Sequence, residues 1–187
     1  MLEYFVTNTH IPPNWGEIAP VFLTECVWSP NSAPDVSVQC ARTDDGLLLV
    51  RLHSYSPPSR AVNTTDDSPV YQDNCLEFFF DAGGGNYINL EANSASALLA
   101  FIGPDRFSRT PLSKTRLERP TVKSMVFENG WEAVFTVPAS LVAPNEMRAN
   151  FYSCGDKTEA PYYSSWNKVE TERPDFHRPE FFGMLKF

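Results

Sequence analysis

The sequence predicts an all-β fold, an antiparallel β-sandwich of the immunoglobulin or jelly-roll kind, built as one domain over residues 1–187. Several short segments alternate apolar and polar residues with the period of two that is typical of a half-buried strand. The chain contains 16 prolines, and turn residues separate these segments. No window shows the 3.6-residue periodicity of an amphipathic helix. Many short strands with turn signals between them indicate a sandwich or barrel, and 187 residues suit a single domain.

The N-terminal half is predicted to hold the first strand and two hairpins. The first strand is expected at 20–28 (PVFLTECVW). Segments 36–42 and 47–55 flank Asp-Asp-Gly, which is a strong hairpin-turn signal. Segments 75–81 and 87–94 flank Ala-Gly-Gly-Gly-Asn, and this loop predicts the second hairpin.

The C-terminal half is predicted to add three strong strands. WEAVFTV (131–137) follows Asn-Gly and ends at Pro138, whose missing N–H cannot donate to a ladder. ANFYSC (149–154) and FGMLKF (182–187) complete the set. A single helical turn is expected around 139–142.

The charge of the chain narrows the choice of partners. A net charge of −8 predicts that neither nucleic acid nor an anionic membrane is the main partner, because phosphate binding requires a basic surface. A mildly basic run lies between residues 106 and 123, but Pro111 and Pro120 interrupt it and favour a solvated loop. No apolar run reaches the roughly 20 residues of a membrane span.

The cysteines and the N-terminal segment bear on the compartment. The cysteines at 26, 40, 75 and 154 form no CxxC pair and have no zinc-site spacing, so buried thiols are expected. The N-terminal segment shows neither the basic nor the apolar region of a signal peptide. Both observations favour the cytoplasm.

The second hairpin carries the most informative pattern. Successive strand residues point to opposite faces of a sheet, so the apolar residues of 75–81 form one face and Glu77 lies on the other. If Asp81 pairs with Tyr87 across the five-residue loop, Glu77 lies directly opposite Glu91. Like charges at that position destabilise a strand pair. The pair of carboxylates therefore requires a physical cause.

Three causes are compatible with the sequence. An arginine of a neighbouring strand, Arg51 for instance, or solvation on an exposed sheet would compensate the charges. Alternatively, the carboxylates would line a polar, concave face that binds hydroxyl groups or positive charge. In the third case, Glu77 and Glu91 would be a proton-sharing acid pair of a glycoside-active enzyme.

Several motifs occur in a characteristic order along the chain. Trp28 is followed by VSVQCARTDDGLLLVRLHSYS, DNCLEFFFDAGGGNYINLEAN, GWEAVFTVPASLV, ANFYSCGD, SSW and FHRPEFFGMLKF. Together these motifs resemble the family 9 carbohydrate-binding modules and their single-domain relatives in the DOMON-like β-sandwich group. The resemblance implies a binding module rather than an enzyme, with an oligosaccharide or polysaccharide as its partner.

The resemblance also implies positions for a sugar site. In that family two aromatic rings hold the end of a sugar chain, and polar residues contact its hydroxyl groups. The matching positions place the rings at Tyr71 and Phe176 and the polar strand residue at Glu77. This choice agrees with general chemistry, because an aromatic face suits the C–H face of a sugar and charged groups orient its hydroxyls.

The sequence departs from the family pattern at three polar positions. Glu91 stands where the family has an arginine, and Tyr152 stands where it has a glutamine. Arg173 falls on a family asparagine and is expected to supply the missing guanidinium from another direction. His177, next to Phe176, is expected to hydrogen-bond either the ligand or a loop carbonyl.

A structural calcium ion is a further implication of the resemblance. Relatives bind calcium, and the carboxylates of Asp66, Asp67 and Asp73 precede the acidic strand. Hard oxygen ligands suit that ion. A solvated acidic loop is the alternative interpretation.

Two functions from other classes also remain open. A haem-binding electron-transfer domain would require methionine and histidine ligands to converge, and these would come from Met125, Met147, Met184, His53 and His177. A protein–protein module would use the aromatic C-terminal loop as its interface.

Overall fold

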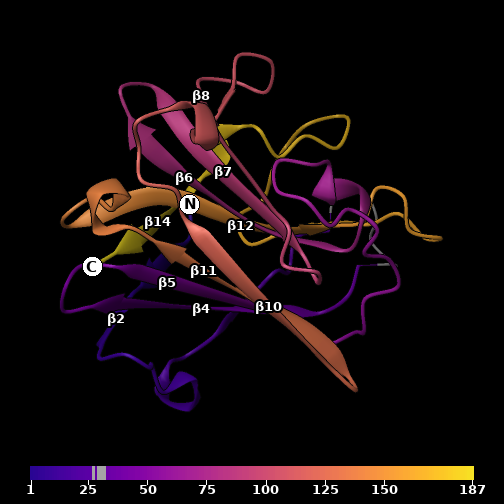
Figure 1. The fold of residues 1–187 in the computed structure, drawn as a ribbon, viewed down its shortest axis with the longest axis horizontal. Helices are drawn as coiled ribbons and strands as arrows, with labels where there is room; N and C mark the ends of the chain where they lie inside the picture. Colours follow the sequence, from indigo (N-terminus) through magenta and orange to yellow (C-terminus); the bar gives the residue numbers. More distant parts are fainter. Residues whose placement is uncertain (27, 29–32) are drawn as a thin grey trace.

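The computed structural model describes residues 1–26, 28 and 33–187 and shows two β-sheets packed face to face (Figure 1). The larger sheet has the strand order β1–β14–β12–β6–β7–β8–β9, and β13 also pairs with β12. The smaller sheet has the order β10–β11–β5–β4–β2, and β3 also pairs with β4. The predicted β-sandwich is confirmed.

The larger sheet consists of β1 (Glu3–Phe5), β6 (Cys75–Gly83), β7 (Asn86–Asn93), β8 (Leu98–Gly103), β9 (Thr110–Pro111), β12 (Glu146–Cys154), β13 (Tyr163–Ser165) and β14 (Gly183–Lys186). The smaller sheet consists of β2 (Thr7–Thr9), β3 (Val21–Phe22), β4 (Val36–Thr43), β5 (Leu48–Ser54), β10 (Thr121–Phe127) and β11 (Gly130–Val137). The described residues form no α-helix, only five turns of 3-10 helix: η1 (Trp15–Glu17), η2 (Val70–Gln72), η3 (Leu112–Lys114), η4 (Ala139–Leu141) and η5 (Pro179–Phe181). The turn η4 is the helical turn expected around 139–142.

Both predicted hairpins are present. Strands β4 and β5 pair around the acidic turn, and β6 and β7 pair around the Gly-rich loop. Asp81 pairs with Tyr87, and a bulge between Asp81 and Gly83 absorbs the odd residue of the loop. Glu77 therefore lies directly opposite Glu91, in the register that the sequence predicts.

The core lies between the two sheets. Phe78 stacks on Phe80 with ring centroids 5.0 Å apart and on Phe151 at 5.3 Å. Trp131 and Phe135 of β11 face them from the smaller sheet, and all five side chains are buried. Because alternate residues of β6 point to this layer, Glu77 and Phe79 point to the outer face of the larger sheet.

The structure corrects the prediction at two places. The expected first strand over 20–28 contains only the two-residue β3, because the chain leaves the smaller sheet there and Glu25 bridges to Ser165 of the larger one. Val27 lies outside the described residues. The pairing is also not wholly antiparallel, because β1 runs parallel to β14 and β2 runs parallel to β4.

A second group of buried residues covers the outer face of the larger sheet. It includes Phe79, Tyr87 and Tyr152 from the strands and Phe176 and Phe182 from the C-terminal segment. The long segments before β6 and after β13 therefore fold over this face rather than extending into solvent. The candidate site lies beneath these segments.

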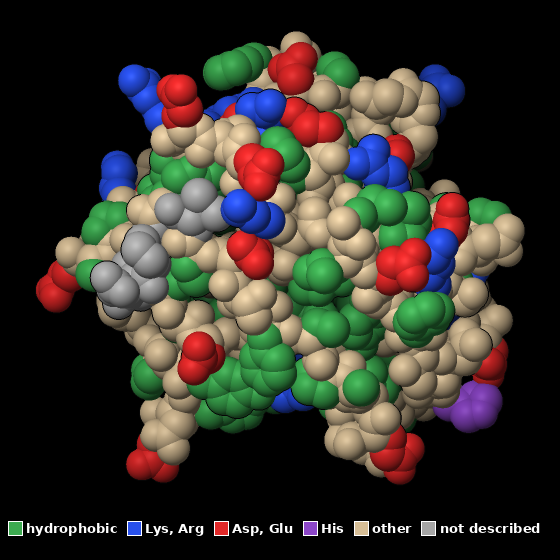
Figure 2. Space-filling view, turned by 180° about the vertical axis from the view of Figure 1, so that it is seen from behind, with side chains coloured by type: hydrophobic (Ala, Val, Ile, Leu, Met, Phe, Trp, Pro, Cys, Tyr) green, Lys and Arg blue, Asp and Glu red, His purple; other side chains and the backbone are tan. Residues whose placement is uncertain are grey.

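The charged side chains are mixed on the face drawn in Figure 2. Lysines and arginines are interspersed there with aspartates and glutamates and form no continuous basic area. Among the described residues, no helix has the length and apolarity needed to cross a membrane.

Candidate functional site

A cavity of about 230 Å³ opens on the outer face of the larger sheet. Its floor consists of strand residues, and its walls are loops. The residues that line it are Tyr71, Glu77, Glu91, Leu99, Arg106, Phe107, Arg109, Cys154, Asp156, Tyr163, Pro174, Asp175, Phe176 and His177. Five of the seven predicted binding residues are among them, so segments separated by more than a hundred residues converge here. We refer to this space as the site cavity.

Two opposed carboxyl groups form the floor of the site cavity. Glu77 and Glu91 are only 2% and 3% exposed. Glu77 accepts a hydrogen bond from the Cys154 thiol at 3.0 Å, and Glu91 accepts one from the Asn89 side-chain amide at 2.9 Å. Burial disfavours their charged forms and raises the pKa of Glu91 to about 7. Burial, reinforced by the charge of Glu91, also raises the pKa of Glu77 well above its usual range.

The compensating cation is Arg109, which follows β8. Its Nη1 lies 3.9 Å from Glu91 Oε1, and its guanidinium lies 5.6 Å from the centroid of the Phe101 ring. Arg51, the arginine proposed from the sequence, is in the other sheet, where it bonds Glu132 at 2.5 Å. The interpretation through Arg51 or a solvated sheet is therefore wrong.

Gly103 determines where Arg109 sits. A Cβ atom at Gly103 would lie 2.4 Å from the carbonyl oxygen of Ser108 and 2.8 Å from the Cα of Arg109. Only glycine permits the loop to return so closely over the end of β8. This close approach carries Arg109 to the wall of the site cavity.

His177 is held as a neutral side chain. Its Nδ1 lies 2.9 Å from the Tyr87 hydroxyl, and its ring lies 5.0 Å from the ring of Phe79. Burial, together with the charges of Arg109 and Arg106, lowers the pKa of His177 to about 2. A side chain with this pKa can exchange hydrogen bonds with a ligand but carries no charge at physiological pH.

The two predicted aromatic contacts differ in exposure. Tyr71, on η2, is 37% exposed and is one of the residues that line the site cavity. Phe176 is 8% exposed, because one face of its ring stacks on Tyr152 at 4.2 Å and Trp28 packs against it at 5.7 Å. Phe176 therefore forms part of a wall, whereas Tyr71 offers an accessible ring.

Two predicted polar residues do not reach the site cavity. Tyr152 is fully buried behind Phe176, and Arg173 is exposed outside the cavity lining. Arg173 therefore does not replace the missing guanidinium, because Arg109 occupies the position beside Glu91.

Sequence reasoning missed the loop that supplies this arginine. Arg106, Phe107 and Arg109 all line the site cavity, and Phe107 is 93% exposed at its rim. The nearby prolines suggested a solvated loop. A more useful signal was an aromatic residue between two arginines. Asp156, Tyr163 and Asp175 were also missed and carry no local pattern of their own.

The expectation of calcium at three aspartates finds no support in their contacts. Asp67 binds Arg119 at 2.9 Å, and Asp66 accepts a hydrogen bond from the Leu98 amide at 3.0 Å. The buried Asp73 accepts hydrogen bonds from Asn63 and Asn93. Each of these carboxylates therefore already contacts N–H donors of the protein, and Asp73 Oδ1 also lies 3.2 Å from Nε of Arg60.

The haem alternative finds no support either. His177 lines the site cavity, and no methionine is among the lining residues. Met147 and Met184 line a separate cavity that has no histidine in its lining. His53 packs on Tyr55 in the smaller sheet. Among the described residues, the structure thus separates His177 from Met147 and Met184, whereas Met125 and His53 lie two strands apart, on either side of Glu132.

Comparisons with known proteins identify the family and the fold of this chain. The carbohydrate-binding family 9 profile matches residues 17–187. A candidate carbohydrate-binding protein from Bacteroides uniformis ATCC 8492 superposes with a TM-score of 0.84 at 28% identity, over 99% of this chain and 98% of that one. No curated protein matches the chain.

Two more distant structures share the fold. Both are family 9 modules from Caldicellulosiruptor kristjanssonii with 14% identity, and both cover 99% of this chain. The complex with glucose has a TM-score of 0.69 over 95% of that chain, and the complex with cellotriose has 0.72 over 93%. Because the family profile spans nine-tenths of the sequence, this chain belongs to the carbohydrate-binding family 9.

Proposed function

We propose that this protein binds carbohydrate without catalysis and takes one saccharide unit, or the end of a longer chain, into the site cavity. The observation that carries the proposal is the combination of an accessible Tyr71 ring with Glu77, Glu91 and Arg109 in one cavity. A volume of about 230 Å³ lies below the roughly 300–1,000 Å³ of pockets for drug-sized ligands. A single sugar unit suits such a space.

The chemistry of the site cavity matches both surfaces of a sugar. The Tyr71 ring would contact the apolar C–H face, and the edge of Phe176 would close the opposite side. The carboxyl groups of Glu77 and Glu91 would bond the hydroxyls. Because burial raises the pKa of both groups, a protonated member of the pair can donate as well as accept. Arg109 would add charge-assisted donors.

The structural relatives suggest which ligands to test first. The Caldicellulosiruptor kristjanssonii modules were captured with glucose and cellotriose. Neutral gluco-oligosaccharides are therefore the first members of a suitable panel. The departures at Glu91 and Tyr71 give reason to include other neutral sugars and amino sugars.

The placement of the carboxyl groups favours binding over hydrolysis. The acid and base of a glycosidase flank the scissile bond. Glu77 and Glu91 instead lie side by side on adjacent strands and approach a ligand from the same side. This geometry supports contact with hydroxyl groups of one ring.

Calorimetric titration against a glycan panel tests the proposal. Tyr71→Ala should weaken the binding of a panel sugar about tenfold, the equivalent of roughly 1.4 kcal/mol of stacking. Glu77→Gln should weaken it further, because the amide replaces one oxygen of a carboxyl group, which can both donate and accept hydrogen bonds, with an NH₂ group that only donates. Tyr55→Ala is the matched control, since Tyr55 is 51% exposed on the smaller sheet and lies outside the site cavity. Equal affinities for Tyr71→Ala and wild type, or no binding to any sugar, would contradict the proposal.

A further inference from the structure

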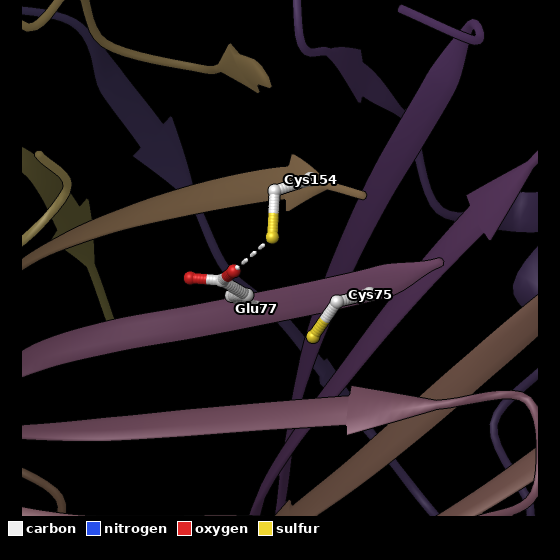
Figure 3. Close-up of side chains that lie close together, drawn as sticks. All are labelled: Cys75, Glu77 and Cys154. Carbon is white, nitrogen blue, oxygen red and sulfur yellow. Dashed lines mark hydrogen bonds between the residues drawn. The ribbon is translucent and has the colours of Figure 1, made fainter. Parts of the chain in front are cut away.

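Two cysteines and a glutamate converge at one end of the site-cavity floor (Figure 3). Cys75 and Glu77 are two residues apart on β6 and therefore share its outer face. Cys154 is the residue of β12 that pairs directly with Cys75. The two sulfur atoms and a carboxylate oxygen lie within 4.8 Å of one another, and all three residues are buried.

These three side chains form a ligand set of a definite kind. Two thiolates and one carboxylate suit zinc and similar thiophilic divalent ions, whereas calcium and magnesium prefer oxygen ligands alone. Bonds of about 2.3 Å to sulfur and 2.0–2.2 Å to oxygen place tetrahedral ligands about 3.5–3.8 Å apart. Cys154 Sγ and a Glu77 oxygen are 3.0 Å apart, so small side-chain rotations would suffice.

The charges on the floor provide a second, independent reason to expect a cation. Glu77 faces Glu91 across the strand pair. Arg109 lies beside Glu91, but no described residue forms an ion pair with Glu77. Two facing buried carboxyl groups are stabilised either by a bound proton or by nearby positive charge. An ion held by Cys75, Cys154 and Glu77 would supply positive charge beside Glu77, with which Arg109 forms no ion pair.

The position of the cluster leaves one coordination site open. Glu77 and Cys154 line the site cavity, whereas Cys75 lies behind them. Three protein ligands on a tetrahedral ion leave a fourth position for water or another oxygen ligand. Here that position would face the space proposed for the sugar.

We propose that Cys75, Glu77 and Cys154 bind one thiophilic divalent cation of the zinc class, with its open position directed into the site cavity. Each thiol, and the Glu77 carboxyl group where it is protonated, releases its proton to solvent when the ion binds, and no electron is transferred. The inference shares Glu77 with the proposed sugar site but does not depend on it, because cation binding is measured without sugar.

The test uses the full chain, reduced with a phosphine and freed of metal with a chelator. Titration with Co²⁺ should give thiolate charge-transfer and tetrahedral d–d absorption that saturates at one ion per chain. Zn²⁺ should then displace the Co²⁺. Cys75→Ser and Cys154→Ser should each lower the affinity by more than the roughly 10–100-fold that loss of an outer-shell partner costs. Cys26→Ser is the control, because Cys26 lies outside the cluster.

X-ray absorption on zinc-loaded wild-type protein keeps the test decisive if a variant fails to fold. Two sulfur ligands and at least one oxygen ligand are expected. The proposal is overturned by saturable binding without sulfur ligands, by the absence of binding, or by a Cys75–Cys154 disulfide that persists in the phosphine-reduced chain. Sugar titrations with and without Zn²⁺ separate the two proposals. A chain that binds the cation but no sugar supports only the cation site, and a chain that binds sugar but no cation supports only the sugar site.

Discussion

At the residue scale, a carboxyl group that faces another carboxyl group in the interior binds its proton more tightly than in water. The site-cavity floor brings Glu77 and Glu91 together in this way; Arg109 and Asn89 partly offset the effect at Glu91, and the Cys154 thiol and Arg109 partly offset it at Glu77. The pairing itself follows from the sequence, because the hairpin loop fixes the register of β6 and β7. The position of the Arg109 guanidinium does not follow from the sequence, because Arg109 reaches the site through tertiary packing at Gly103.

The raised pKa values predict how stability depends on pH. Below the ordinary glutamate pKa, both carboxyls are protonated in the folded and unfolded states. As the pH rises from about 4.5 towards 7, the unfolded chain ionises first and the folded state loses stability. We expect a decrease of roughly 1–3 kcal/mol in the free energy of unfolding over this window, measured by urea denaturation with chelator present.

Glu91→Gln should flatten this decrease. The charged neighbours of Glu91 are Glu77 on β6, Arg109 and Arg106 on the loop after β8, and Asp156 after β12. With the amide at 91, Glu77 no longer faces an ionisable group across the strand pair. An unchanged slope in the variant would show that other groups cause the pH dependence.

The Asp67–Arg119 pair predicts the opposite dependence at acid pH. The hydrogen bonds from Arg119, Ser113 and the Ala100 amide outweigh partial burial and lower the pKa of Asp67. The contribution of Asp67 to the free energy of unfolding is therefore fully present above the ordinary aspartate pKa. It is lost as the pH falls through the lowered pKa of the folded state. Asp67→Asn should cost about 1 kcal/mol at pH 7 and progressively less in acid.

Asparagine is suitable for this test because residue 67 has a φ of 57°. Asparagine tolerates this left-handed conformation better than most residues. Asp66→Asn is the matched neighbour, since Asp66 is more exposed and lies 3.5 Å from Arg119. If both variants have the same pH profile, the bonds of Asp67 are not the cause.

At the scale of elements, the loop between β8 and β9 connects the sheet to the site cavity. Asp105 accepts hydrogen bonds from the amides of Phe107 and Ser108, and this turn holds the loop in shape. Gly103 lets the loop lie against the end of β8. The loop is therefore a small preformed unit that presents its arginines to the site cavity.

Gly103→Ala should weaken sugar binding more than it weakens the fold. The added methyl group meets backbone atoms of Ser108 and Arg109, which must move and carry the guanidinium away from Glu91. We expect at least about a tenfold loss of affinity, as for loss of one charge-assisted contact. Calorimetry gives the affinity, and thermal unfolding gives the cost to the fold.

Gly84→Ala provides the comparison for this effect. Gly84 has a φ of 62°, but an added Cβ there meets only the tip of the Asn86 side chain at 3.9 Å. Gly84→Ala should therefore lower the stability of the fold while the affinity for sugar stays unchanged. A parallel loss of affinity in both variants would mean that Gly103 acts through global stability.

The elements differ in how well the sequence predicts them. The hairpins around Asp-Asp-Gly and the Gly-rich loop are predictable, because local turn chemistry and alternation specify them. The strands β1 and β2 have three residues each, which is too short for a periodic pattern. Cys75 and Cys154 are far apart in the chain and meet only through the pairing of β6 with β12, so no local spacing predicts their cluster.

At the scale of the whole molecule, burial is concentrated in the centre of the larger sheet. Strands β6 and β12 pair with neighbours on both sides, and their inward side chains are buried. Strand β10 is an edge strand of the smaller sheet, and most of its side chains are exposed. The alternation of the sequence predicts the sandwich class, but it does not predict which strands lie at its edges.

Hydrogen exchange should follow this distribution. Amides of β6 and β12 should exchange only through global opening, whereas amides of β10 should exchange through local fraying and therefore much faster. Mass spectrometry of peptides from deuterated protein measures both. Equal protection of β10 and β6 would show that another chain covers this edge in solution.

The parallel pairing of β1 with β14 bears on how the molecule is made. The ribosome makes residues 3–5 long before residues 183–186, yet these segments are neighbours in the finished sheet. Strand β1 therefore stays without its β14 partner until residues 183–186 have been made, and the edge of β12 that pairs with β14 stays open for a shorter time. Such distant pairing slows folding, because the chain entropy lost on closing so large a loop precedes any gain from contact. A premature stop before Gly183 would leave both of these strand edges open to intermolecular association.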